Sequence, residues 1–136
     1  MMRRLVLAIA MLGNPVLAQN DALGAMQDYA DFATYDAGII RPAQITQDIF
    51  PSLYFIDTRQ ASNFEQGTIP GAVNIEWRAI FGDVDAIPTG QKVVLFCDTG
   101  VLSAQAAFGL RVSGLENVLV LQSGFQGWLA HVDASQ

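Results

Sequence analysis

Residues 92–112 of the chain read KVVLFCDTGVLSAQAAFGLRV, and their pattern is the clearest indication of the fold class. Lys92–Phe96 is short, β-branched and almost wholly apolar, which predicts a buried strand. Residues 103–112 are predicted to form a helix, and Ser103 is placed to cap it. Short apolar strands that alternate with helices are typical of a parallel sheet covered on both faces.

The same alternation runs through the rest of the chain. Further strands are expected at residues 38–41, 53–56, 72–75 and 118–121, further helices at 21–32, 60–66 and 126–131, and a helical turn over 42–50. These elements predict an α/β fold with a central parallel sheet and helices on both faces. We find no internal repeat and no linker that would indicate a second domain.

Length and composition exclude several classes of protein. The chain has 136 residues, of which 51 % are hydrophobic and 15 % charged, so it is long enough for one core and too apolar to be disordered. With seven Lys and Arg residues against thirteen Asp and Glu, the chain has a net charge of −6 and no cluster of cations that could bind nucleic acid. One cysteine and one histidine make a metal site improbable on sequence grounds. We therefore expect no nucleic-acid partner, no metal and no cofactor.

Residues 1–18 have the order of a secretory signal peptide. Arg3 and Arg4 precede an apolar run at residues 5–12, a helix-breaking segment follows, and Ala18 precedes Gln19 at a cleavage site. The alternative is an N-terminal membrane anchor, which needs about 20 apolar residues. We expect cleavage near Ala18–Gln19, a periplasmic or secreted protein, and no stable membrane anchor afterwards. Residues 19–37 would then form an N-terminal helical extension.

Cys97 is the only cysteine, so it cannot belong to an internal disulfide. It lies at the carboxyl end of a predicted strand, where open α/β sheets bind their ligands. The loop that follows can direct its amides inward, and the next helix begins there, so both would favour a thiolate. A nucleophile would then need no histidine. The alternative is a buried cysteine that packs as a small hydrophobic residue.

Four motifs follow one another between residues 54 and 128. They are Asp57-Thr58-Arg59 followed by Phe64, residues 67–75 (GTIPGAVNI), residues 97–104 (CDTGVLSA) and residues 123–128 (SGFQGW). In order and spacing, the chain resembles the rhodanese-like sulfurtransferases. The resemblance implies a single rhodanese-like domain over residues 38–132, with a central parallel five-stranded sheet and helices on both faces.

The resemblance also implies a reaction. Cys97 would take sulfane sulfur from a donor of the thiosulfate or 3-mercaptopyruvate class, hold it as a persulfide, and pass it to a thiophilic small molecule or a protein acceptor. The implied substrate-binding loop consists of Asp98, Thr99, Gly100, Val101, Leu102 and Ser103. The alternative from another class is a rhodanese-fold persulfide carrier or protein-binding module with little turnover.

Four positions depart from the family pattern. Leu102 stands where many single-domain members have Arg, and Asp98 places a negative charge beside the cysteine, so we expect poor use of thiosulfate. The uncharged second half of the loop looks more like that of relatives that use mercaptopyruvate. Asn63 replaces the usual Glu, which removes an ion pair with Arg59, and Thr68 replaces the usual His.

Three residues outside the loop are candidate supporting residues. Asp57, at a strand end, would either brace the neighbouring loop or take part in the reaction. Arg59 belongs to the same motif. Arg78, just after a predicted strand, would either bind the substrate as a cation or remain a solvated charge.

The targeting segment gives the first prediction. N-terminal sequencing of the exported protein should begin at Gln19 or within two residues of it, because the charged, apolar and small-residue order specifies cleavage there. A mature species in the membrane fraction that still begins at Met1 would contradict this expectation.

Overall fold

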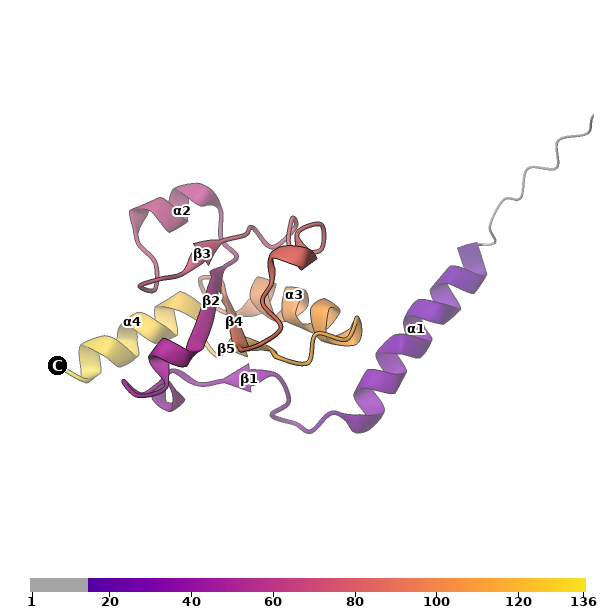
Figure 1. Cartoon of the computed structure of the whole chain (residues 1–136), viewed down its shortest axis with the longest axis horizontal. Helices are drawn as coiled ribbons and strands as arrows, with labels where there is room; N and C mark the ends of the chain where they lie inside the picture. The colour runs from indigo at the N-terminus through magenta and orange to yellow at the C-terminus, as the bar shows by residue number, and fades with distance from the viewer. Residues whose placement is uncertain (1–14) are drawn as a thin grey trace, which may run out of the picture.

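The computed structural model describes residues 15–136, with side chains described from Asp21 onward. The apolar run and the two arginines of the predicted signal peptide lie outside the described residues. Five parallel strands form one sheet (Figure 1). In spatial order they are β1 (Ile39–Ile40), β5 (Val118–Leu121), β4 (Lys92–Phe96), β2 (Leu53–Asp57) and β3 (Val73–Asn74).

Strand β4 lies at the centre of the sheet, and its residues from Val93 to Phe96 are fully buried. It pairs with β2 so that Phe96 is opposite Asp57. The Thr58 N–H then donates to the carbonyl of Phe96 over 2.8 Å. Cys97 and the residues after Asp57 consequently leave the sheet side by side, at the edge where parallel α/β sheets bind ligands.

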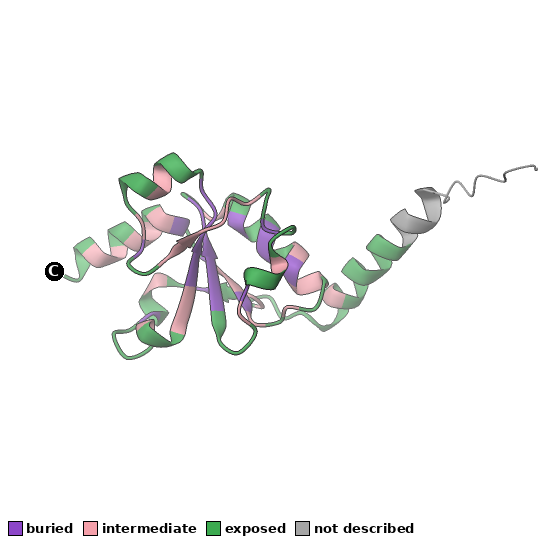
Figure 2. Ribbon diagram, turned by 45° about the horizontal axis from the view of Figure 1, so that its top comes forward, coloured by how far each residue is buried: buried purple, intermediate pink, exposed green. Residues whose placement is uncertain are grey.

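The alternation of side chains along the strands divides the core between two faces. One face packs Ile56, Val93 and Leu95 against buried residues of α3 (Val101–Val112). The other face packs Val94 and Phe96 in a cluster that includes residues of α4 (Gly124–Ala134). Burial along the strands is visible in Figure 2. The predicted α/β fold, with a parallel five-stranded sheet and helices on both faces, is confirmed.

The remaining elements are short apart from the first helix. They are α1 (Pro15–Phe32), η1 (Pro42–Gln44), η2 (Phe50–Ser52), α2 (Ala61–Gln66) and the 3₁₀ turn η3 (Val84–Ala86). Only the start of the helical turn expected over residues 42–50 is helical, as η1, and η2 begins at its last residue, Phe50.

Three helices begin earlier than the sequence predicted, and α4 is one of them, since it begins at Gly124 instead of residue 126. Helix α3 begins at Val101, and its N-cap is Gly100 with φ of 94°, so the prediction that Ser103 caps this helix was wrong. A left-handed glycine turns the chain straight from the loop into the helix, which places Ser103 in the first turn. Helix α1 begins at Pro15, a residue type that suits the first helical position, and crosses the predicted cleavage position.

Helix α1 extends away from the sheet, and its residues from Asp21 to Phe32 are mostly exposed (Figures 1 and 2). Its contact with the rest of the protein is centred on Tyr29, whose hydroxyl accepts a hydrogen bond from Arg111 Nε over 3.1 Å. The same ring meets Phe108 edge-on, with the ring centroids 5.5 Å apart. Within residues 15–136, no helix combines the length and apolarity needed to cross a membrane.

Candidate active site

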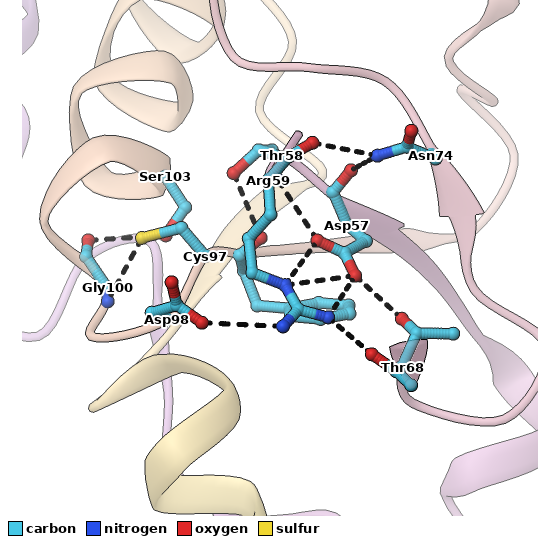
Figure 3. Close-up of polar contacts among 11 residues, drawn as sticks. Asp57, Thr58, Arg59, Thr68, Asn74, Cys97, Asp98, Gly100 and Ser103 are labelled. Atoms are coloured by element: carbon cyan, nitrogen blue, oxygen red, sulfur yellow. Dashed lines mark hydrogen bonds and ion pairs between the residues drawn. The ribbon is translucent and has the colours of Figure 1, made fainter. Parts of the chain in front are cut away.

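The sulfur of Cys97 lies in a cradle formed by its own loop (Figure 3). The residue is 4 % exposed, and the Gly100 N–H donates to Sγ over 3.2 Å. Ser103 Oγ lies 3.5 Å from Sγ and 3.2 Å from the Gly100 carbonyl oxygen. Gly100 adopts a left-handed conformation, and a Cβ at this position would lie 3.3 Å from the carbonyl oxygen of Leu121. A glycine therefore suits both the turn and the close approach.

The cradle decides the ionisation of Cys97. Burial by itself raises the pKa of the thiol, but the Ser103 hydroxyl and the amides of Ser103, Thr99 and Gly100 act in the opposite direction. The hydrogen bonds outweigh burial, so the pKa of Cys97 lies below its ordinary value. Hydrogen-bond donors that favour the anion thus replace a neighbouring cation or histidine.

The start of α4 holds the loop from the other side. The Phe125 N–H donates to the Cys97 carbonyl over 2.7 Å, and the Gln126 N–H donates to the Asp98 carbonyl over 3.0 Å. Gly124 has φ of 59°, and a Cβ there would lie 2.5 Å from the Cys97 carbonyl oxygen. The sequence analysis did not predict this contact between α4 and the cysteine loop. Gly124 of the SGFQGW motif was the residue that could have indicated it.

A buried ion pair lies beside the loop. Asp57 is fully buried, and its Oδ2 is 2.7 Å from Arg59 Nη2. The same Nη2 donates to the Gly67 carbonyl over 2.6 Å, and the guanidinium lies 4.4 Å from the centre of the Phe125 ring. The hydrogen bonds that Arg59 donates to Asp57 raise the pKa of Arg59 despite its burial. The structure thus makes Asp57 a brace for Arg59.

Residues of the GTIPGAVNI motif complete this arrangement. Thr68, which replaces the family's usual His, donates its hydroxyl proton to Asp57 Oδ2 over 2.8 Å. Asn74 Nδ2 lies 2.9 Å from the main-chain carbonyl oxygens of both Asp57 and Arg59. The motif therefore fixes the end of β2, a role that neither Thr68 nor Asn74 was assigned from the sequence.

Arg59 also reaches the cysteine loop. Its Nη1 lies 3.4 Å from Oδ1 of Asp98, whose side chain is 51 % exposed. Residues 98–103 include no Lys, Arg or His, but Arg59, from the end of β2, places its positive charge against this loop. Because Asp57 already balances the charge of Arg59, the group of Asp57, Arg59 and Asp98 carries a net charge of −1.

A cavity of about 470 Å³ opens beside Asp98 and Leu102. It brings together four of the residues singled out in the sequence, since Arg59 and Arg78 also line it. The Arg78 side chain is 69 % exposed, and its Nε lies 3.1 and 3.2 Å from the two carboxylate oxygens of Glu76. A larger cavity of about 690 Å³ lies beside α1 and contains none of the loop residues.

The side chains of Val101 and Thr99, two residues of the predicted loop site, do not line the cavity beside Asp98. The Val101 side chain is 63 % exposed. Thr99 contributes through its amide, which helps to lower the pKa of Cys97. Within the described part of the chain, no group of three or more His, Cys, Asp or Glu residues is arranged to hold a metal ion.

Comparison with known proteins identifies the family. The model of the rhodanese-like domain matches residues 43–131. The chain belongs to the rhodanese-like domain family. The match includes all four motifs, so the family and the fold inferred from them are confirmed.

Relatives of this rhodanese-like domain include a protein that is named for sulfur transfer. The chain is 31 % identical to the sulfurtransferase of Allochromatium vinosum, over 63 % of this chain and 77 % of that protein. It is 32 % identical to the uncharacterized protein YqhL of Bacillus subtilis, over 68 % and 76 % of the two chains. A rhodanese-related protein of Thermoplasma volcanium has the same fold, with a TM-score of 0.63, 22 % identity and coverage of 68 % and 91 %.

The cradle around Cys97 gives the second prediction. The rate of alkylation by iodoacetamide should reach half its maximum below pH 8.5, the approximate pKa of a free cysteine, because only the thiolate reacts. Replacing Ser103 with Ala should move this midpoint upward by about 0.5–1 pH unit, since a hydrogen bond contributes about 1 kcal/mol.

Ser113→Ala, at the other end of α3, is the matched control and should leave the midpoint unchanged, because its hydroxyl donates to Leu110 instead. A Ser103→Ala midpoint equal to that of the original protein would contradict the assigned role of the hydroxyl.

Proposed function

We propose that this rhodanese-like domain is a sulfurtransferase in which Cys97 carries sulfane sulfur as a persulfide. One observation carries the proposal: the buried Cys97 sulfur accepts the Gly100 N–H at the carboxyl end of β4, with its pKa lowered. A thiolate stabilised in this way is a nucleophile that needs no histidine partner. The 31 % identity to a relative named sulfurtransferase supports the same reaction class.

The loading step transfers one sulfur atom to the enzyme. The Cys97 thiolate attacks the sulfane sulfur of thiosulfate, the S–S bond of the donor breaks, and sulfite leaves with the bonding electron pair. With 3-mercaptopyruvate, the C–S bond breaks instead, and the thiol proton goes to the carbon, so that pyruvate leaves. In both cases the product is the Cys97 persulfide anion, and no oxidant or metal takes part.

The discharge step returns the cysteine to its starting state. An acceptor thiol attacks the outer sulfur of the persulfide, and the Cys97 thiolate leaves with the electron pair of the S–S bond. The acceptor becomes a persulfide and keeps the proton of its thiol. The Gly100 amide that stabilises the resting thiolate also stabilises this leaving group, which lowers the barrier.

The charges beside the loop favour a donor with one negative charge over one with two. The group of Asp57, Arg59 and Asp98 has a net charge of −1 and lies next to the sulfur-bearing residue. Two unit charges a few ångströms apart interact by on the order of 1 kcal/mol or more near a protein surface. We therefore propose the 3-mercaptopyruvate class as the better donor and thiosulfate as the poorer one.

A persulfide carrier with little turnover is the second candidate. It is favoured by the same negative charge beside Cys97, which would slow the reaction of anionic donors. The two candidates differ in whether donors of any class load the cysteine and acceptors discharge it repeatedly.

We also propose that the protein works outside the cytoplasm, in the periplasm or as a secreted protein. The support is the order of charged, apolar and small residues in the first eighteen positions.

The third prediction tests the nucleophile. After exposure to excess 3-mercaptopyruvate or thiosulfate, intact mass spectrometry should show a gain of one sulfur atom, which a thiol then removes. Cys97→Ser should gain none with either donor, because a serine hydroxyl does not ionise near neutral pH. Absence of sulfur on the original protein with every donor would contradict the enzyme proposal and favour a protein-binding module.

The fourth prediction tests the donor preference. Asp98→Asn removes one negative charge, and Leu102→Arg adds a positive one, so each should raise kcat/KM for thiosulfate by about fivefold to tenfold. The value for 3-mercaptopyruvate should change less, because this donor carries one charge fewer.

Asp133→Asn is the control, since it removes the same charge from an exposed position on α4. Equal gains for the two donors would show that donor charge does not decide the preference.

A further inference from the structure

We propose that the cavity beside the cysteine loop binds a zwitterionic acceptor, an α-amino acid that carries a thiol. This inference rests on the proposed sulfur transfer and names its acceptor class. The cavity holds about 470 Å³, within the range of about 300–1,000 Å³ that small-molecule sites have. Asp98 and Leu102, both from the cysteine loop, form part of its wall.

One wall of the cavity offers a carboxylate oxygen. Asp98 contacts Arg59 through Oδ1 alone, at 3.4 Å, and its side chain is half exposed. Among the hydrogen bonds of the described residues, none involves Asp98 Oδ2. The guanidinium of Arg59 is already engaged by Asp57 and Gly67, so it does not cancel the charge of Asp98 fully. This oxygen is therefore available to an ammonium group.

The cavity also offers a guanidinium with free donors. Arg78 contacts Glu76 through Nε only, and neither of its Nη atoms has a hydrogen-bond partner among the described residues. Its side chain is largely exposed, so the two Nη groups can turn to meet a carboxylate in bidentate geometry. Arg78 thus supplies the complement to Asp98.

The two free groups together match an amino acid better than they match a simple anion. A dianion would gain the donors of Arg78 but would meet the uncompensated charge of Asp98. A zwitterion places its carboxylate at the two free Nη groups of Arg78 and its ammonium at the free oxygen of Asp98. Because Nε of Arg78 stays with Glu76, the carboxylate is held there by hydrogen bonds from Nη rather than by an unpaired charge. Because Asp98 and Leu102 of the cysteine loop form part of the cavity wall, a thiol bound there lies beside the loop that carries Cys97.

The experiment follows the discharge of the Cys97 persulfide, loaded beforehand and verified by mass. Four probe thiols are compared: cysteine, cysteamine, which lacks the carboxylate, 3-mercaptopropionate, which lacks the ammonium, and 2-mercaptoethanol, which lacks both. The measured quantity is the ratio of kcat/KM for two thiols within one protein. Effects of a substitution on the sulfur itself then cancel.

Each substitution should lower a different ratio. Asp98→Asn should reduce the ratio of kcat/KM for cysteine to that for 3-mercaptopropionate by about fivefold. Of these two thiols, only cysteine has an ammonium group that can pair with the carboxylate of Asp98. Arg78→Gln should reduce the ratio of kcat/KM for cysteine to that for cysteamine by a similar factor. Of these two thiols, only cysteine has a carboxylate that can bind the guanidinium of Arg78. Arg41→Gln, an exposed cation next to the strand at the opposite edge of the sheet, is the matched control and should change neither ratio.

Ratios that stay unchanged in both variants, or that change in only one, would overturn the two-point site and leave sulfur loading intact. Failure of the original protein to load sulfur at all would overturn the proposed function, and this inference with it. The two failures are therefore distinguishable in one series of measurements.

Discussion

The buried ion pair of Asp57 and Arg59 is the contact around which the site is organised. Moving two charges out of water is costly, and such a pair is weak as a source of stability, but removal of one partner costs about 3–5 kcal/mol. Here the pair satisfies its remaining donors and acceptors through Gly67 and Thr68. The end of β2, the following turn and the cysteine loop are consequently held in one arrangement, because Arg59 also contacts Asp98.

The cysteine loop meets a second constraint, which is the close approach of α4. Amides at the start of that helix bind the carbonyls of Cys97 and Asp98. With these carbonyls engaged there, the Gly100 amide of the loop is directed at the sulfur. A thiolate can therefore be stabilised by hydrogen bonds alone, in a chain whose loop has no cation and whose single histidine lies elsewhere on α4. The left-handed glycines at 100 and 124 make both approaches sterically feasible.

Different groups stabilise the sulfur and carry the charges beside it, although a single cation in the loop could do both. Main-chain donors stabilise the sulfur anion, while the side chains of Asp98 and Arg78 present opposite charges to the neighbouring cavity. Under the proposed function, a substrate would be selected by how its charges are distributed. The same proposal favours organic sulfur compounds over small inorganic dianions as substrates.

Local sequence patterns were enough to predict the order of the strands along the chain, the family and the position of Cys97, because short apolar strands and fixed motif spacings are local properties. The sequence also indicated that Asp57 could act as a brace. It made Ser103 the cap of α3, whereas this helix begins at Val101 after a left-handed turn at Gly100, which lies close to the carbonyl oxygen of Leu121. The contact between Arg59 and Asp98, residues 39 positions apart, was decided only by the tertiary structure. Parallel pairing of β2 with β4 brings their ends together, and no local pattern records that distance.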